Sequence, residues 1–345
     1  MRAGVVLINF GEPERPDADA VVAYLERIFL ANARLEPDEA GRRRARELAE
    51  RRAPGLIAEY RAMGGSPLHA QTAGQASRLA GELERRGHDV VVRTGMQFTE
   101  PGLPEAVESA RAAGAGSLVA LPLYPLTGPS TTVDALQALV RAVAASGWEV
   151  PVRAVAGWHA HEAYTALRAA VVREYCREKG LDLADPETRL VLSAHGTPLR
   201  YLREGSRYDV YVRDHARRLT AALGVDRWAL GYQNHANRPG VEWTEPDIER
   251  VVRELDARRA VVVPISFMQE QSETLSELDL ELRAEAEEVG LEFHRVPVPH
   301  ADPRFAALLA DLVEPLVNGV RPADRGLGPC RCVGCVPTHC LVHGG

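Results

Sequence analysis

The stretch Val-Val-Leu-Ile-Asn-Phe-Gly-Glu-Pro at residues 5–13 decides the fold, because a near copy returns at residues 190–198 as Leu-Val-Leu-Ser-Ala-His-Gly-Thr-Pro. In each copy an apolar run leads into a Gly-x-Pro turn, which is typical of a buried strand that ends at a loop. A second pair of apolar runs, residues 118–122 and 260–264, also ends in proline. The repetition predicts two similar halves.

Short apolar runs alternate with helical patterns along the whole chain. Strands are expected at 4–9, 90–94, 118–121, 151–154, 190–193, 228–231, 260–264 and 291–296, with helices between them such as 70–86, 104–113, 132–145, 163–179 and 208–223. Continuous apolar strands separated by helices are typical of a parallel sheet that is covered on both faces. We therefore predict an α/β fold of two Rossmann-like, doubly wound halves, residues 1–155 and 156–320, followed by a cysteine-rich tail at 321–345.

Composition and charge exclude several classes of function. The chain has 345 residues, 46% of them hydrophobic, and a net charge of −7, whereas nucleic-acid binding requires a concentrated positive face. The arginines of residues 42–52 alternate with Glu and Ala, which is typical of a solvated helix face. No stretch approaches the ~20 apolar residues of a membrane-spanning helix, so any membrane contact would be peripheral.

The N-terminus begins with a predicted strand and lacks the apolar run and cleavage site of a signal peptide. We therefore expect a cytoplasmic protein, loosely membrane-associated at most, in a reducing compartment.

Four of the five cysteines crowd into the C-terminal tail, at Cys330, Cys332, Cys335 and Cys340. The tail has no apolar periodicity and could not fold alone, so a metal bound by thiolates would supply its order. A structural zinc and an iron–sulfur cluster both fit such ligands. Disulfides are the alternative, which a reducing compartment disfavours.

In open α/β sheets ligands bind at the carboxyl ends of the strands. Phe10, Tyr124, His195 and Phe267 follow predicted strands directly. His195 could accept a proton near neutral pH or ligate a metal. A purely structural histidine at a strand end is the competing interpretation.

The segment after the strand at 260–264 is rich in carboxylates. Glu270, Glu273, Glu277 and Glu281 recur at spacings of three and four residues, which on a helix would place them on one face. Like charges so arranged raise one another's pKa. A solvated helix face is the alternative, but the start of this segment beside His195 favours a functional role.

Several motifs in one order resemble the ferrochelatase family over residues 3–318. They are Leu-Val-Leu-Ser-Ala-His-Gly-Thr-Pro at 190–198, Tyr-Arg-Ala-Met-Gly-Gly-Ser-Pro at 60–67, Leu-Pro-Leu-Tyr-Pro at 121–125 with Ser-Thr-Thr at 130–132, Val-Glu-Trp at 241–243, and Pro-Ile-Ser-Phe at 264–267 with Ser-Glu-Thr-Leu-Ser-Glu-Leu-Asp at 272–279. The resemblance implies insertion of Fe²⁺ into a porphyrin by two Rossmann-like halves around a porphyrin cleft.

The same resemblance implies roles for individual residues. His195 matches the active-site histidine and Glu273 the carboxylate that faces it, so both would meet the substrate Fe²⁺. Glu277 and Glu281 would continue the carboxylate ladder. The positions that match porphyrin-binding residues are Phe10, Arg52, Tyr60, Arg61, Ser66, Tyr124, Trp243 and Phe267.

The chain also departs from the family pattern. Gln271 stands where many members have a second histidine, and an amide cannot accept a proton at neutral pH. Gln97 replaces a common arginine, and the segment 234–240 is about two residues longer than usual.

The region around Phe10 resembles users of protoporphyrin more than users of coproporphyrin. A monomer or a homodimer is expected.

Some ferrochelatases bind a 2Fe-2S cluster through a C-terminal cysteine run, and the spacing of Cys332, Cys335 and Cys340 matches one of them. The internal fourth ligand of those members corresponds here to Pro129. Cys330 is then the candidate fourth ligand, because Cys176 reads as a packing residue within a helix. Zinc remains the alternative occupant.

Two other functions stay open. One is a related chelatase for another metal or tetrapyrrole, and the other is a non-enzymatic haem or iron sensor. The retention of both His195 and Glu273 disfavours the sensor.

Overall fold

The computed structural model describes residues 2–32, 39–234 and 241–319, and it places the strands in two parallel sheets of four. The strand orders, β2-β1-β3-β4 and β6-β5-β7-β8, are equivalent. The first sheet comprises β1 (Ala3–Asn9), β2 (Val90–Met96), β3 (Ser117–Pro122) and β4 (Val152–Ala154), and the second β5 (Thr188–His195), β6 (Trp228–Gln233), β7 (Arg259–Pro264) and β8 (Glu292–Arg295). All eight predicted strands are therefore confirmed, as are the two doubly wound halves.

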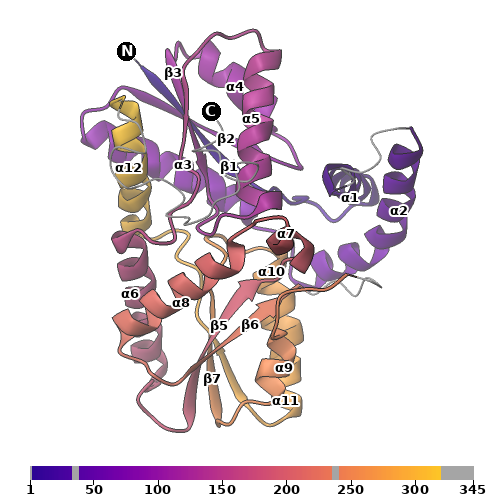
Figure 1. The fold of residues 1–345 in the computed structure, drawn as a ribbon, viewed down its shortest axis with the longest axis vertical. Helices are drawn as coiled ribbons and strands as arrows, with labels where there is room; N and C mark the ends of the chain where they lie inside the picture. Colours follow the sequence, from indigo (N-terminus) through magenta and orange to yellow (C-terminus); the bar gives the residue numbers. More distant parts are fainter. Residues whose placement is uncertain (1, 33–38, 235–240, 320–345) are drawn as a thin grey trace.

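Helices cover both sheets. They are α1 (Ala18–Asn32), α2 (Glu39–Ala62), α3 (Leu68–Arg85), α4 (Leu103–Ala112), α5 (Asp134–Ala145), α6 (Glu162–Lys179), α7 (Leu199–Arg203), α8 (Tyr208–Leu223), α9 (Ile248–Arg253), α10 (Ser272–Leu275), α11 (Arg283–Glu288) and α12 (Pro303–Val317). The strands of both halves run toward the middle of the molecule, so their carboxyl ends meet between the halves (Figure 1).

The two repeated strands pair with their neighbours in the same way. β1 lies between β2 and β3, and β5 lies between β6 and β7, with parallel registers throughout. Both central strands are buried, because helices cover the two faces of each sheet. This arrangement puts the loop after β1 and the loop after β5 at the edge where the halves meet.

Two π-helical turns were not expected from sequence. η1 (Pro129–Val133) follows β3 and η2 (Glu277–Leu282) follows the loop after β7, so they occupy corresponding places in the two halves. A π turn widens a helix locally and is frequent at functional sites. η2 carries Glu277 and Glu281.

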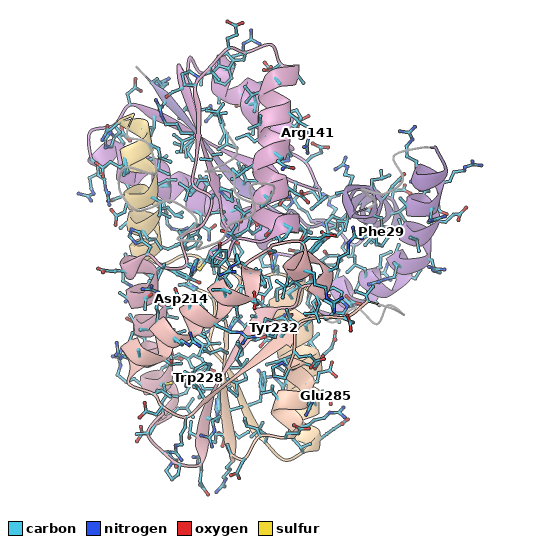
Figure 2. The ribbon with its side chains drawn as sticks, viewed as in Figure 1. Phe29, Arg141, Asp214, Trp228, Tyr232 and Glu285 are labelled. Carbon is cyan, nitrogen blue, oxygen red and sulfur yellow. The ribbon has the colours of Figure 1, made fainter. Side chains whose placement is uncertain are left out.

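The pair α1 and α2 projects away from the sheets, with Phe29 on α1 (Figures 1 and 2). It has a small core of its own, in which Val21, Leu25 and Ala53 are buried. The arginines of α2 at 42–44, 46 and 51–52 are exposed, as predicted for a solvated face. None of the helices in the described ranges has the length and apolar character needed to cross a bilayer.

The last helix, α12, returns to the first half. Leu309 and Val313 pack in the same apolar cluster as Leu7 of β1, and Arg86 at the end of α3 donates to Asp311 and Glu314 at 2.7 and 3.0 Å. α12 therefore ties the two halves together. Cys330, Cys332, Cys335 and Cys340 lie outside the described residues.

Candidate active site

His195 is the last residue of β5, and its imidazole is held in one tautomer. Nδ1 lies 2.6 Å from the carbonyl oxygen of Gly196. Because a carbonyl only accepts, Nδ1 carries the proton and donates it. Nε2 is then the acceptor atom, and it receives the side-chain amide of Asn234 at 2.9 Å.

The backbone around His195 is also fixed. Its amide donates to Ser266 Oγ at 2.9 Å, and its carbonyl accepts from Tyr208 Oη at 3.0 Å. Phe267 packs edge-on to the imidazole, with 6.2 Å between ring centroids. The structure thus brings together two of the residues expected at the site, His195 and Phe267.

Sequence reasoning missed the two residues at the end of β6. Gln233 Nε2 donates to the Glu273 carbonyl at 2.6 Å and to Glu277 Oε2 at 3.0 Å, and Asn234 contacts His195. Asn234 has a φ of +60°, a left-handed conformation that Asn tolerates better than most residues. Two consecutive residues therefore connect the carboxylates to the histidine. Their position at a strand end was the available signal.

Glu273 and Glu277 are close enough to influence each other. Burial raises the pKa of Glu273 above its usual value. Burial, and then the charge of Glu273, raise the pKa of Glu277 well above its usual value. Raised pKa values mean that these carboxyls bind protons more readily than usual, and a divalent cation would compete with protons for the same oxygens.

A third carboxylate, Glu12, lies beside them although it comes from the first half. Glu12 follows β1 and is only 2% exposed. It accepts hydrogen bonds from the hydroxyls of Ser66 and Ser272 and, at 3.2 Å, from the Ser272 amide. Burial, and then the charge of Glu273, raise its pKa to about 7. A signal existed, since Glu12 corresponds to Thr197 in the repeated motif.

The expected ladder of four carboxylates was wrong in one member. Residues 267–271 are not helical, because α10 begins only at Ser272. Glu270 instead points to Arg295, which donates to its two oxygens at 2.8 and 3.0 Å. The amide of Val298 also donates to it at 3.1 Å. Glu270 is therefore part of a structural ion pair.

The carboxylates continue toward the surface. Glu281, which is exposed, lies on η2 and accepts from Ser276 Oγ at 3.2 Å. Glu59 on α2 is exposed, and partial desolvation, followed by the charge of Glu281, raises its pKa, while Arg52 acts in the opposite direction. The acidic line, defined here as Glu12, Glu273, Glu277, Glu281 and Glu59, thus runs from a buried end to an exposed one. In the described part of the chain, no three His, Cys, Asp or Glu side chains converge as a ready-made metal site.

Aromatic side chains surround the buried end of this line. Phe10 packs on Phe98 with centroids 4.5 Å apart and edge-on to Tyr24 at 6.4 Å. Tyr60 is 1% exposed, and burial raises its pKa. Burial and the charge of Glu273 raise the pKa of Tyr124 well above its usual value, so Tyr124 faces the same interior.

The remaining predicted porphyrin residues take different positions. Tyr124 donates to Gln97 Oε1 at 2.5 Å, so the glutamine that replaces a common arginine lies at the site. Trp243 is half-buried and bridges to Pro198, three residues after His195. Arg52 and Arg61 are exposed on α2. Arg52 acts through its charge on Glu59, and both arginines remain predictions as porphyrin contacts.

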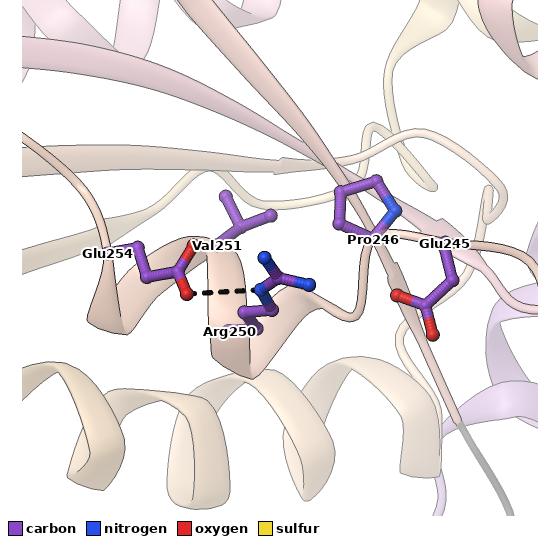
Figure 3. Close-up of a pocket in the computed structure, with 5 residues that line it drawn as sticks. All are labelled: Glu245, Pro246, Arg250, Val251 and Glu254. Carbon is purple, nitrogen blue, oxygen red and sulfur yellow. Dashed lines mark hydrogen bonds and ion pairs between the residues drawn. The ribbon is translucent and has the colours of Figure 1, made fainter.

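A surface hollow of about 460 Å³ lies elsewhere, on α9 (Figure 3). It is lined by Glu245, Pro246, Arg250, Val251 and Glu254. Arg250 pairs with Glu254 at 3.1 Å. This hollow contains neither His195 nor a member of the acidic line, so we do not assign the reaction to it.

The two-halved architecture also occurs in a solved structure. SirB from Bacillus subtilis with Fe³⁺ superposes with a TM-score of 0.56 over 93% of this chain and 99% of its own, at 13% identity. This similarity concerns the fold.

Sequence comparison names the family. The ferrochelatase family model matches residues 2–316. A ferrochelatase of Synechococcus sp. strain RCC307 is 35% identical over 331 residues, covering 92% of this chain and 83% of its own. One of Synechococcus sp. strain JA-3-3Ab is 35% identical over 335 residues, covering 93% and 96%. The chain belongs to the ferrochelatase family, the metal chelatases that insert Fe²⁺ into porphyrin in haem biosynthesis.

Proposed function

We propose that this chain inserts ferrous iron into protoporphyrin IX in preference to coproporphyrin III. His195 is the proton acceptor, and Glu273 is the carboxylate on the opposite side of the macrocycle. The observation that carries the proposal is the tautomer of His195. The contact of Nδ1 with Gly196 leaves Nε2 as the acceptor at the junction of the two halves.

Insertion releases the two protons of the pyrrole N–H groups. A neutral imidazole can take such a proton at Nε2 while its Nδ1–H remains on the Gly196 carbonyl. Asn234, which now donates to Nε2, would yield this position to the substrate. The fixed backbone of His195 keeps Nε2 in place during that exchange.

The acidic line suits the delivery of Fe²⁺. Carboxylate oxygens bind this ion without the tight hold of thiolates, so it can be passed on. Glu281 and Glu59 at the exposed end would receive the ion, and Glu277 and Glu273 would bring it inward. Because burial raises the pKa of both inner carboxyls, protons compete there with the dication for the same oxygens.

The preference for protoporphyrin rests on the wall near β1. Phe10, Phe98 and Tyr24 form an aromatic cluster there. Protoporphyrin carries two vinyl groups in place of two of the propionates of coproporphyrin. An apolar wall accepts a vinyl group more readily than a carboxylate that would lose its hydration. Arg52 at the exposed end of the site would then meet a propionate.

For the tail we propose a 2Fe-2S cluster on Cys330, Cys332, Cys335 and Cys340, with zinc as the alternative. Cys176 is a poor substitute ligand, because it is buried in α6 and burial raises the pKa of its thiol to about 11.

We further propose a cytoplasmic enzyme, monomeric or homodimeric, with at most loose peripheral contact to a membrane.

The test is His195→Ala, measured with ferrous iron and protoporphyrin under anaerobic conditions. We expect loss of insertion while porphyrin binding, followed by fluorescence titration, is largely retained. His294→Ala, which removes a histidine on β8 that contacts Glu292, is the matched control and should retain activity. An active His195→Ala enzyme would exclude the proposed role.

A further inference from the structure

Glu12 is a buried carboxylate without a cation among its described contacts. Its oxygens meet two hydroxyl groups and one amide, from Ser66 and Ser272. Glu270, a buried carboxylate of the second half, has Arg295 as a charged partner. Burying a carboxylate is costly without a counter-charge, so a glutamate kept only for stability would be paired as Glu270 is.

The location of Glu12 explains what it could do. It belongs to the loop after β1 in the first half, whereas Ser272 is the first residue of α10 in the second half. The contact between them spans 260 positions of sequence. Glu12 therefore fixes the start of the element that carries Glu273.

Ser272 connects the two carboxylates directly. Its hydroxyl, which has one proton to donate, lies between two acceptors: it contacts Glu12 Oε1 and is 3.0 Å from Glu273 Oε2. Its backbone amide points to Glu12 as well, at 3.2 Å. The contacts with Glu12 thus hold the Ser272 side chain in one rotamer, and in that rotamer its hydroxyl lies beside the Glu273 carboxylate.

We propose that Glu12 is a positioning residue, which reaches across from the first half and fixes the Glu273 carboxylate through Ser272. The inference rests on the proposed role of Glu273. Both halves then contribute to the site, because the orientation of the Glu273 carboxylate in the second half depends on the Glu12 side chain of the first. Ser66 on the other side of Glu12 holds that side chain in turn.

The test is a double-mutant cycle on Glu12→Gln and Ser272→Ala, with kcat for iron insertion and KM for porphyrin measured separately. We expect each single variant to lower kcat about tenfold and to leave the porphyrin KM within about twofold. The double variant should be no slower than the slower single variant, because both changes break the same connection.

Three further measurements separate the possible outcomes. Glu12→Asp keeps the charge but shortens the side chain, so it should be as slow as Glu12→Gln; wild-type activity would show that charge alone matters and overturn the inference. Thermal midpoints identify variants that fail to fold, and the conservative Ser272→Ala then still tests the connection through its kcat. Glu314→Gln, a surface carboxylate paired with Arg86, is the control.

Glu273→Gln is measured in parallel to distinguish the two proposals. If it keeps its kcat, the proposed role of Glu273 fails. If it loses kcat while Glu12→Gln and Ser272→Ala act independently, so that their effects multiply, only the positioning role fails. A porphyrin KM that rises in step with the fall in kcat would likewise contradict positioning, because it would indicate a general disturbance of the site.

Discussion

The substitution Arg295→Met tests whether Glu270 belongs to the framework or to the chemistry. Arg295 donates to both oxygens of Glu270 at 2.8 and 3.0 Å and to Asp279 at 2.8 Å. The Arg295 and Glu270 side chains are only 9% and 11% exposed. Removing the cation leaves the buried Glu270 carboxylate without its charged partner, and breaking a buried pair in this way costs about 3–5 kcal/mol. That is a large part of a typical stability of about 5–15 kcal/mol.

The assay is urea unfolding at pH 7, with the free energy of unfolding compared between wild type and variant. A decrease in the free energy of unfolding below about 1 kcal/mol would refute the structural role, because solvent-exposed ion pairs contribute no more than that. Glu270→Gln completes the argument. Since its carboxylate points to Arg295, we expect the folded variant to insert iron within a few-fold of the wild-type rate. An inactive but stable protein would show that Glu270 takes part in the chemistry.

Three further predictions concern other parts of the chain. Burial lowers the pKa of His159, which faces Asp214 at 3.6 Å, to about 4. His159 therefore takes up a proton on unfolding below pH 6.5. Between pH 7 and pH 5, the free energy of unfolding measured in urea titrations should fall by about 2 kcal/mol more for wild type than for His159→Phe. Equal losses in the two proteins would contradict this prediction. Gly11→Ala should cost about 1–3 kcal/mol, since φ is +85° and a Cβ would approach Thr99 Oγ1, and a variant as stable as wild type would show that the loop relaxes freely. Cys335→Ser should remove the visible absorption of the anaerobically purified protein, whereas a colourless wild type would favour zinc.

The sequence predicted the sheets well because their strands are continuous apolar runs. The interior strands β1, β3, β5 and β7 are largely such runs, whereas the edge strands β4 and β8 contain charged residues, although they too were predicted. The repeat of residues 5–13 at 190–198 correctly indicated two equivalent halves. Burial on both faces leaves few alternatives for such a run. The π turns η1 and η2 could not be found this way, because they depend on a shift of backbone hydrogen bonds.

The site was only partly predictable for a related reason. Spacing assigned Glu270 to a helical face, but the backbone at Gln271 is extended, with φ −161° and ψ −175°, and the helix starts after it. Glu12 and Asn234 each stand alone just after a strand, and this position at a strand end marks a candidate residue without naming its partner. Their contacts with Ser272 and His195 arise only when strands distant in sequence end at one edge.

Anaerobic turnover of ferrous iron with protoporphyrin and coproporphyrin, followed side by side by the loss of free-porphyrin fluorescence, tests the central claim most directly. We predict that iron enters protoporphyrin faster than coproporphyrin and that Glu273→Gln slows the reaction. Binding of both porphyrins without insertion would contradict the claim and favour a sensor, and insertion into coproporphyrin alone would overturn the assigned substrate.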